Sequence, residues 1–478
     1  MEHLDVLVVG AGLSGIGGGY HLQKHRPGKS YAILEGRDAI GGTWDLFRYP
    51  GIRSDSDMYT LGYSFQPWRN AKSIADGPSI LEYIRETARE YGIDRKIRFG
   101  HRVRRAAWSS ADSRWLVDVE TNDGVKRLTC SFIYLCTGYY DYESGYTPEW
   151  KGTERFGGAI VHPQKWPEDL DYTGKRVVVI GSGATAVTLV PAMSETASHV
   201  TMLQRSPSHI AALPSKDPIA RVLRRTLPAR AAYRITRWKN VSLAMFFYNL
   251  ARRYPAYFRR MLLKGARRKL GRDFDLAHFT PEYEPWDQRL CLIPDADLFN
   301  AIRSGRASIV TDSIETFTET GLRLASGEHL DADIIVTATG LNLKLMSGLE
   351  LVVDGERVDL AKTMTYKGMM YSDVPNLASA LGYTNASWTL KCDLTAEYVC
   401  RLLNHMDAYG YSRCTPRRSD PSVMEEPAID FSSGYVQRAL HTLPKQGSKK
   451  PWRLHQNYAR DMMSLRYSRL EDGAMEFR

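Results

Sequence analysis

The chain has 478 residues, which predicts two to four domains at about 100–200 residues per domain. Hydrophobic residues make up 43% and charged residues 25% of it, a composition typical of globular proteins and not of disordered or fibrous ones. The net charge of +10 is compatible with binding to nucleic acid or to a membrane surface. Six scattered cysteines without a C-x-x-C pair exclude a disulfide-rich scaffold, are typical of a reducing compartment, and lead us to expect no metal site.

The sequence predicts neither a membrane-spanning helix nor a signal peptide. Its best candidate for a span, residues 241–248 (VSLAMFFY), is far shorter than the ~18 uninterrupted apolar residues needed to cross a bilayer. The opening residues MEHLDVLVVG lack the basic start, the apolar core and the cleavage site of a signal peptide. We therefore expect a cytoplasmic location.

A dinucleotide-binding turn is predicted near the start of the chain. Residues 5–9 (DVLVV) predict a strand, and Gly10, Gly12 and Gly15 follow it as G-x-G-x-x-G before a predicted helix. In this motif the first glycine permits the tight bend, the second lets the backbone approach a pyrophosphate, and the third allows close helix–strand packing. A second predicted strand ends at Glu35, whose carboxylate can accept hydrogen bonds from ribose hydroxyls, so the turn favours FAD over an ordinary glycine-rich loop.

The same arrangement recurs in the middle of the chain with different chemistry. A predicted strand over residues 176–180 leads into a G-x-G-x-x-A motif over residues 181–186. The next predicted strand, residues 199–203, is followed by Arg205 and Ser206 where the first unit has an acid. Arginine beside a hydroxyl suits a 2′-phosphate, so this turn predicts NADPH. One turn thus favours a cofactor with free ribose hydroxyls and the other a cofactor with a 2′-phosphate. Two such cofactors in one chain imply electron transfer between them.

The fold class predicted from these anchors is α/β, with two Rossmann-like dinucleotide-binding domains, for FAD and NADPH, and a basic helical insert. A predicted strand over residues 132–136 closes the first unit, and another over residues 334–337 closes the second. The NADPH unit is then inserted within the FAD domain. The expected boundaries are 1–142 and 344–478 for the two parts of the FAD-binding domain, 143–213 and 276–343 for those of the NADPH-binding domain, and 214–275 for the insert.

Two further segments resemble a known family. The pattern F-x-G-x-x-x-H-x-x-x-W-P resembles the fingerprint of type I Baeyer–Villiger monooxygenases, and residues 41–55, beginning GGTW and ending at an aspartate, resemble that family's second signature. Residues 286–294, 382–391 and 451–458 are similar to the mycobacterial ethionamide-activating group of the family. By this resemblance the histidine couples the two nucleotide domains and does not touch substrate. The fingerprint residues are Phe156, Gly158, His162, Trp166 and Pro167.

The resemblance implies an NADPH- and O₂-dependent flavin monooxygenase. It would convert ketones to esters or lactones through a flavin C4a-peroxide and would also oxygenate sulfides or thioamides. The catalytic cation is Arg289 by resemblance, since arginine stays charged beside an oxygen anion, and Asp55 would orient it. Without the surrounding motifs, a surface salt bridge and a turn residue would be the favoured interpretations of these two side chains.

The resemblance also implies the cofactor-binding residues. One position departs from the family pattern, because Gln288 stands where many members carry a lysine that contacts the 2′-phosphate, so we expect weaker selectivity for NADPH over NADH. The flavin set is Gly10, Gly12, Ser14, Gly15, Glu35, Thr43, Trp44, Asp45, Leu46, Asp55 and Val103. The NADPH set is Arg53, Ser54, Asp55, Ser182, Gly183, Ala184, Thr185, Arg205 and Ser206.

Several alternatives stay open on the sequence alone. A flavin monooxygenase acting mainly on sulfur or nitrogen is the nearest rival, and a non-catalytic flavin-binding sensor or membrane scaffold is a remote one. A dithiol flavoreductase is disfavoured because the chain has no paired cysteines. The expected partners are O₂ and a small apolar ketone or sulfide. Tyr383, Trp388 and Trp452 could line its pocket or lie in the core.

The positive charge is concentrated in one segment. Residues 216–272 hold 17 lysines and arginines against one acid, Asp217, which gives 17 − 1 = +16 and leaves 10 − 16 = −6 for the rest of the chain. A solvated helical face explains this pattern. Docking to anionic lipid explains it too, and would place the protein peripherally on the inner face of the cell membrane. We expect no nucleic-acid binding, because no recognition motif accompanies the charge.

Overall fold

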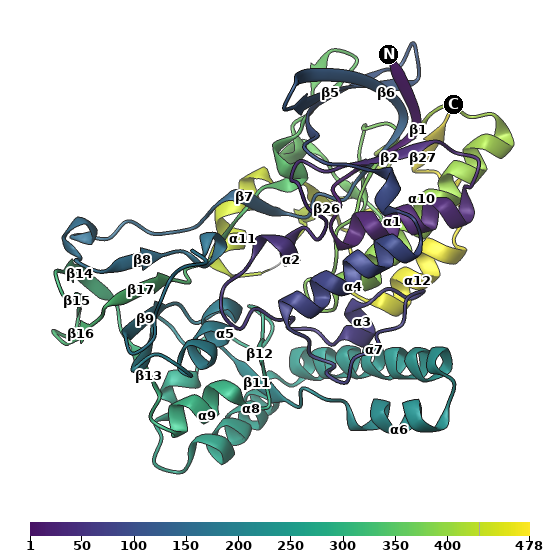
Figure 1. Cartoon of the computed structure of the whole chain (residues 1–478). Helices are drawn as coiled ribbons and strands as arrows, with labels where there is room; N and C mark the ends of the chain where they lie inside the picture. The colour runs from purple at the N-terminus through teal and green to yellow at the C-terminus, as the bar shows by residue number, and fades with distance from the viewer. Residues whose placement is uncertain (430) are drawn as a thin grey trace.

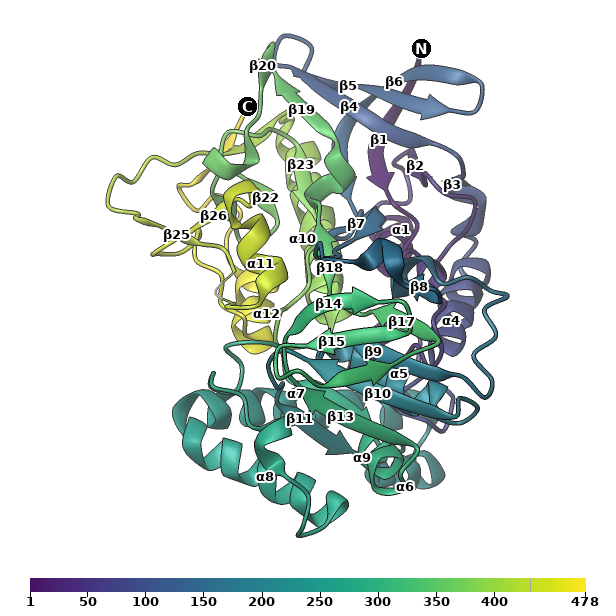
Figure 2. The ribbon, with the colours of Figure 1, turned by 90° about the vertical axis from the view of Figure 1, so that its left-hand side faces the viewer.

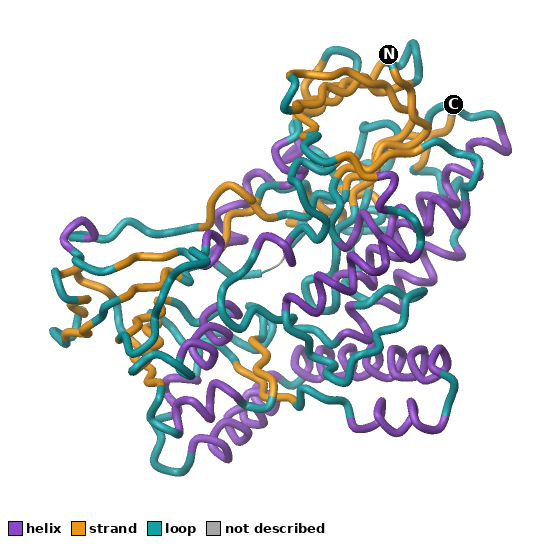
Figure 3. The backbone as a smooth tube through the Cα atoms, in the orientation of Figure 1, coloured by secondary structure: helices purple, strands orange, loops and turns teal. Residues whose placement is uncertain are grey.

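Two β-sheets organise the chain in the computed structural model, which describes residues 1–429 and 431–478 (Figure 1). The first sheet has nine strands: β1 (Glu2–Val9), β2 (Tyr31–Leu34), β3 (Ile97–Arg98), β4 (Arg102–Ser109), β5 (Arg114–Thr121), β6 (Gly124–Leu135), β19 (Glu350–Val353), β20 (Glu356–Arg357) and β23 (Leu377–Ser379). Their order is β20-β19-β4-β5-β6-β1-β2-β3, with β23 paired to β6. β1 pairs in parallel with β2 and β6, while β4, β5 and β6 form an antiparallel meander that curls over one end (Figure 3).

Helices from both ends of the chain cover the first sheet. They are α1 (Leu13–His25), α4 (Gly77–Glu90), α10 (Trp388–Tyr409) and α12 (Tyr458–Tyr467), and the short α2 (Thr43–Leu46) and α3 (Met58–Leu61) precede α4. Val6 and Val8 of β1 belong to the core cluster shared with these helices, whereas Leu7 and Val9 belong to the cluster on the meander side. This alternation of strand residues between two buried faces is expected for the centre of a parallel sheet.

Three consecutive glycines inside α1 are explained by close packing. A Cβ atom on Gly18 would lie 2.8 Å from the ring of Tyr134, and one on Gly19 would lie 2.8 Å from Ile93 Cγ2. Each glycine in a helix interior costs about 1 kcal/mol relative to alanine. Here that cost is offset because only glycine lets α1 approach both β6 and the segment after α4 so closely. The sequence pattern alone does not reveal this requirement.

The second sheet has five parallel strands from the middle of the chain, in the order β13-β10-β9-β17-β8. They are β8 (Ala159–Val161), β9 (Arg176–Ile180), β10 (His199–Gln204), β13 (Ala307–Thr311) and β17 (Ile334–Thr337). On one face α5 (Ala184–Met193) and α9 (Asp297–Arg303) share a core with Val177 and Val179. On the other, the antiparallel sheet β14 (Ile314–Thr318), β15 (Gly321–Leu324) and β16 (His329–Asp331) packs against Val178 and Ile180.

Two antiparallel strands, β7 (Tyr140–Gly145) and β18 (Leu341–Leu343), lie where the chain leaves the first sheet and returns to it. The paired strands β11 (Ile210–Leu213) and β12 (Cys291–Pro294) flank the helical insert. The domain boundaries given above stay a prediction. The remaining elements are β21 (Thr365–Tyr366), β22 (Met370–Tyr371), β24 (Cys414–Pro416), β25 (Glu425–Pro427), β26 (Lys445–Gly447), β27 (Met475–Phe477) and α11 (Gly434–Ala439).

The insert consists of α6 (Pro218–Thr226), α7 (Ala229–Arg253) and α8 (Pro255–Leu270), at the lower side of the molecule in Figure 2. α7 packs on α3 through Arg237, whose guanidinium donates to the carbonyl oxygens of Tyr59 and Gly62. No helix among the described residues is long and apolar enough to cross a membrane.

Candidate active site

The first glycine turn leaves the start of α1 open. Gly10 has φ +102°, and a Cβ there would lie 2.6 Å from the carbonyl oxygen of Cys136; one on Gly15 would lie 1.9 Å from the carbonyl oxygen of Gly10. The nearest atom to a Cβ on Gly12 is 3.5 Å away, so that position has room. Gly12 caps α1 without a side-chain hydrogen bond. The free backbone N–H groups at this helix end suit a phosphate.

The second turn repeats this geometry at the start of α5. Gly181 has φ +141°, and a Cβ there would lie 2.3 Å from the carbonyl oxygen of Ala338. A Cβ on Gly183 would meet nothing within 4 Å, and Gly183 caps α5 without a side-chain hydrogen bond. In both turns, therefore, the first glycine has no room for a Cβ, whereas the second has free space beside it. This arrangement lets a pyrophosphate contact the backbone at the second glycine.

The carboxylate of Glu35 lies at the end of β2 beside the first turn. Its Oε2 accepts from the Ala11 backbone N–H at 2.7 Å and its Oε1 from the Arg37 N–H at 3.0 Å. Burial raises its pKa, an effect that the two N–H donors oppose. The backbone thus fixes this acid at the position where the sequence predicts a ribose contact.

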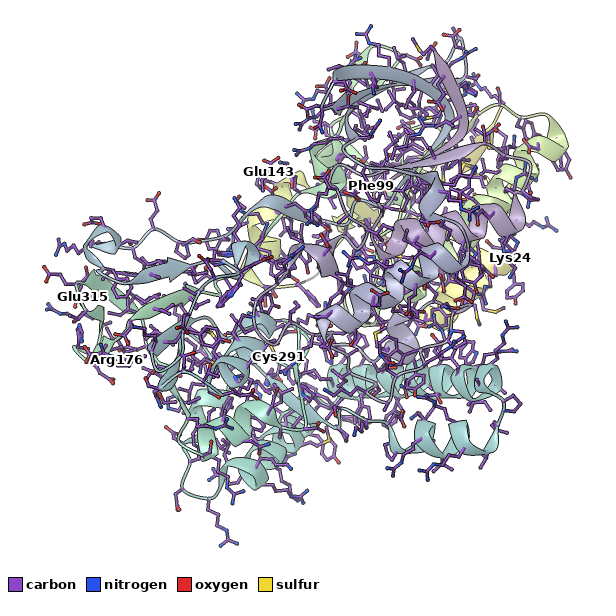
Figure 4. The ribbon with its side chains drawn as sticks, viewed as in Figure 1. Lys24, Phe99, Glu143, Arg176, Cys291 and Glu315 are labelled. Carbon is purple, nitrogen blue, oxygen red and sulfur yellow. The ribbon has the colours of Figure 1, made fainter. Side chains whose placement is uncertain are left out.

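A cavity of about 830 Å³, here called the nucleotide cavity, lies between the two turns. Cys291 at the start of β12 lines it in the middle of the molecule, where Figure 4 labels it. Six of the sequence-predicted cofactor residues do not line it: Gly10, Gly15, Glu35, Asp45, Leu46 and Val103. The predicted residues that do are Gly12, Ser14, Thr43, Trp44, Arg53, Ser54, Asp55, Ser182, Gly183, Ala184, Thr185, Arg205, Ser206 and Arg289.

Three of the predicted cofactor residues, Asp45, Arg53 and Asp55, are held in ion pairs within the protein. Asp45 is 2% exposed, and its oxygens lie 2.7 Å from an Arg37 nitrogen and 3.1 Å from an Arg85 nitrogen. Arg53 pairs with Asp297 at the start of α9. These contacts fix the segment between the GGTW motif and Asp55 against both halves of the molecule.

Arg289 and Asp55 form a direct ion pair. The Arg289 Nε lies 2.7 Å from Asp55 Oδ2, and the two side chains are 34% and 29% exposed. The carboxylate of Asp55 raises the pKa of Arg289 further above its ordinary value, so this side chain carries a permanent positive charge. The sequence-predicted pair is thus brought together from positions far apart in the chain.

Two tyrosines that no sequence motif singled out, Tyr139 and Tyr140, lie beside this pair. Tyr139 stacks on Trp388 with ring centroids 5.0 Å apart, and its hydroxyl lies 3.0 Å from that of Tyr140. Trp388 donates to the Ser14 hydroxyl at 3.0 Å. Burial raises the pKa of Tyr140 to about 12, so its hydroxyl stays protonated. The only sequence signal for these tyrosines was their position after the T-G pair that ends the first nucleotide unit.

Three cavities meet at Arg289, the only described residue that lines all of them. A second cavity of about 350 Å³, the apolar cavity, is lined by Tyr383, Trp388, Phe431 and Leu443 among others. A third, of about 1790 Å³, lies against α7 and α8 and is called the insert cavity. Of the three aromatic residues that could line the pocket or lie in the core, Tyr383 and Trp388 line the apolar cavity. The third, Trp452, is 2% exposed and belongs to the core.

Arg205 and Ser206 lie exposed on the wall of the nucleotide cavity, after β10. No carboxylate of the described residues lies within 4 Å of the Arg205 guanidinium, in contrast to Arg53 and Arg289. Gln288 also lines this cavity. Arg438 also lines the cavity without a carboxylate partner among the described residues, but its guanidinium stacks on the Tyr146 ring. Arg205 is the one of the two that lies at the position predicted for a 2′-phosphate contact.

The fingerprint residues lie outside the three cavities. His162 Nε2 lies 3.2 Å from the carbonyl oxygen of Gly340, and its Nδ1 accepts from the Gln164 N–H at 3.2 Å. These partners fix the neutral tautomer, and burial lowers the pKa of His162. A Cβ on Gly158 would lie 2.3 Å from the Asp333 carbonyl oxygen. The histidine thus joins β8 to the segment that follows β17, next to the strands that connect the two sheets.

Comparison with known proteins identifies the family. A family model described as flavin-binding monooxygenase-like matches residues 72–374, and one described as an NAD(P)-binding Rossmann-like domain matches residues 8–76. The FAD-containing monooxygenase EthA of Mycobacterium tuberculosis is 55% identical over 478 residues, which cover 100% of this chain and 98% of the relative. The chain belongs to the flavin-binding monooxygenase-like family. The resemblance inferred from its motifs is confirmed.

Solved structures show the same fold at low sequence identity. An oxidised steroid monooxygenase bound to NADP matches with a TM-score of 0.77 and 23% identity, covering 99% of each chain. OTEMO in complex with FAD and NADP matches with a TM-score of 0.78 and 21% identity, again covering 99% of each chain. The predicted α/β fold with Rossmann-like nucleotide-binding units is confirmed. Together with its relatives, this makes the chain a flavin-dependent monooxygenase, with O₂ and an organic compound as substrates.

Proposed function

We propose that this chain catalyses Baeyer–Villiger oxidation of ketones with FAD and NADPH as cofactors. In this reaction ketone, O₂, NADPH and H⁺ give ester, NADP⁺ and water. One oxygen atom of O₂ is inserted between the carbonyl carbon and a neighbouring carbon, and the other leaves as water. Cyclic ketones give lactones in the same way.

The observation that carries this proposal is the position of the Arg289–Asp55 pair where the three cavities meet. Bound FAD supplies the redox chemistry, accepting electrons from NADPH and passing them to O₂. The chain must place a permanent cation where negative charge develops on the transferred oxygen, and a preorganised guanidinium does this without protein rearrangement. Asp55 orients the guanidinium by binding the Arg289 Nε.

The two glycine turns fit the two cofactors. The open Gly12 and the fixed Glu35 suit the pyrophosphate and ribose of FAD, and the GGTW segment with Trp44 suits its ring. The open Gly183 and the unpaired Arg205 suit NADPH. The apolar cavity beside Tyr139 and Trp388 suits the reacting end of the substrate, because apolar walls exclude water from the transferred oxygen.

Arg289→Ala tests the role of the cation. We expect the variant to bind FAD and to accept electrons from NADPH, but to form no ester and to release hydrogen peroxide in place of product. Gas chromatography of the ester and stopped-flow absorbance of the flavin measure the two steps separately. Ester formation at the wild-type rate would refute the proposed role of Arg289.

Sulfides and thioamides are proposed as additional substrates of the same cavity, as the resemblance implies. Attack on a carbonyl requires a nucleophilic oxygen, whereas attack on sulfur requires an electrophilic one. Raising the pH should therefore increase the ratio of ester to sulfoxide when a ketone and a sulfide compete. A ratio independent of pH would contradict this distinction.

We also propose that the insert binds an anionic membrane surface. It combines the +16 charge with exposed apolar side chains, including Trp238, Phe246 and Tyr254 at 45%, 59% and 57% exposed. Each basic residue near an anionic surface contributes about 1 kcal/mol. Co-sedimentation with vesicles containing phosphatidylglycerol should therefore fall steeply with salt. Absence of binding to these vesicles at low salt would refute the proposal.

A further inference from the structure

The insert cavity has a wall unlike those of the other two. α7 contributes Leu243 and Phe247, four residues apart and so on one face of the helix, and α8 contributes Tyr257 and Met261 in the same relation. These four side chains are 44%, 42%, 55% and 38% exposed. An apolar strip thus remains open to solvent along a cavity of about 1790 Å³ that extends to Arg289.

A row of cations follows the same cavity. Arg260, Lys264 and Arg268 lie four residues apart on α8, and all three are exposed and line the cavity. No carboxylate among the described residues lies within 4 Å of any of them. By contrast, Arg252 in the last turn of α7 pairs with Asp287, and Arg259 on α8 pairs with Glu284. The cations along the cavity are therefore available to an anionic ligand.

Two polar nitrogens on the cavity wall also lack partners. Trp286 Nε1 and His455 Nε2 are buried and have no hydrogen-bond partner among the described residues. The rings of Trp286 and Tyr248 of α7 are in contact, with centroids 5.4 Å apart. Trp286 comes three residues before Arg289 in the sequence. An unsatisfied buried donor costs about 1–3 kcal/mol, so a polar group in the cavity near Arg289 would be stabilised there.

We propose that the insert cavity binds the chain of a long-chain keto acid. The proposal rests on the proposed Baeyer–Villiger function and names its substrate class. The apolar chain lies along Leu243, Phe247 and Met261, the carboxylate binds the cations of α8, and the ketone lies within the chain near Arg289. Oxygen insertion beside that carbonyl breaks one carbon–carbon bond and forms one carbon–oxygen bond, which gives an ester within the chain.

The test compares three ketones with the FAD-loaded enzyme, without vesicles and below the critical micelle concentration. The ketones are 10-oxohexadecanoic acid, its methyl ester and 2-octanone. We expect kcat/KM to be about tenfold higher for the acid than for its methyl ester. In a Lys264→Glu, Arg268→Glu variant that preference should disappear, while kcat/KM for 2-octanone stays within twofold.

The matched control is Arg225→Glu, Arg230→Glu, which changes the same charge on exposed residues of the insert that do not line the cavity. It should leave the preference for the acid intact. Calorimetric titration with hexadecanoate, which has no ketone, should show binding that only the Lys264, Arg268 variant loses. Equal kcat/KM for acid and ester, or equal loss in both double variants, would overturn the proposal. Failure to oxidise 2-octanone would instead refute the Baeyer–Villiger function.

Discussion

Replacing Arg205 by alanine is expected to reduce selectivity for NADPH over NADH. Its guanidinium lines the nucleotide cavity without a carboxylate partner among the described residues, and this chain has Gln288 where the family resemblance implies a lysine. We therefore propose Arg205 as the main side-chain contact of the 2′-phosphate. Its removal affects only a ligand that carries that phosphate.

The magnitude follows from the strength of hydrogen bonds to charged groups, about 1.5–3 kcal/mol each. Arg205 is exposed, and solvent screening places its contribution at the lower end of that range. A loss of about 1.5 kcal/mol corresponds to a roughly tenfold rise in KM for NADPH. KM for NADH should stay within twofold. Gln288→Lys adds a cation on the same cavity wall and should lower KM for NADPH by up to about tenfold.

Steady-state oxidation of each nicotinamide cofactor with a saturating ketone measures both constants. Arg225→Ala serves as the control, because this exposed arginine lines none of the three cavities and should change neither constant. Flavin absorbance of the purified variants verifies FAD loading. An unchanged ratio of KM for NADH to KM for NADPH in Arg205→Ala would refute the assignment of the phosphate site.

Two further predictions concern the glycine turns and a buried acid. Gly183→Ala should fold with its FAD and raise KM for NADPH at least tenfold, because the added Cβ meets no protein atom within 4 Å but occupies the space for the cofactor phosphates. Gly15→Ala should yield no stable flavoprotein, because the added Cβ would lie 1.9 Å from the Gly10 carbonyl oxygen. Equal flavin loading of the two variants would contradict this reasoning. Asp393→Asn should lower the free energy of unfolding by about 3 kcal/mol in urea titrations at pH 7, since it leaves Arg237 buried with only carbonyl partners. Burial alone would raise the pKa of Asp393, but His21, Arg237 and the Ser64 N–H together hold it below its ordinary value. The stabilisation is therefore complete above about pH 4, near the pKa of an unfolded aspartate, and is lost as the pH falls through the lowered folded pKa. A difference in the free energy of unfolding between wild type and variant that grows as the pH is lowered below about 4 would contradict this reasoning.

Much of the fold and of the site could be predicted from short motifs. Strand, glycine turn and helix come in a fixed order in a nucleotide-binding unit. The motifs that contain Gly12 and Gly183 therefore predicted the strand before each turn and the helix after it. The pairing of Arg289 with Asp55 followed from family resemblance alone. Their separation of more than 200 residues means that nothing local in the sequence brings them together.

The rest depended on packing between distant segments. The roles of Gly18 and Gly19 depend on Tyr134 and Ile93, which come from other elements. The motif that contains Asp45 predicts a cofactor contact for this residue, yet its carboxylate forms ion pairs with Arg37 and Arg85 from other segments. The insert cavity exists only because α7 and α8 lie beside the Arg289 segment. Helical periodicity predicts such a face but not what lies opposite it.

The place of Arg289 where three cavities meet has a thermodynamic consequence. A molecule in any one cavity that changes the position of this guanidinium changes the free energy of binding in the other two. Linkage makes that effect reciprocal, so a substrate that tightens NADP⁺ binding must itself be bound more tightly, by the same factor, when NADP⁺ is present. Affinities measured for one ligand alone are therefore only limiting values for the working enzyme.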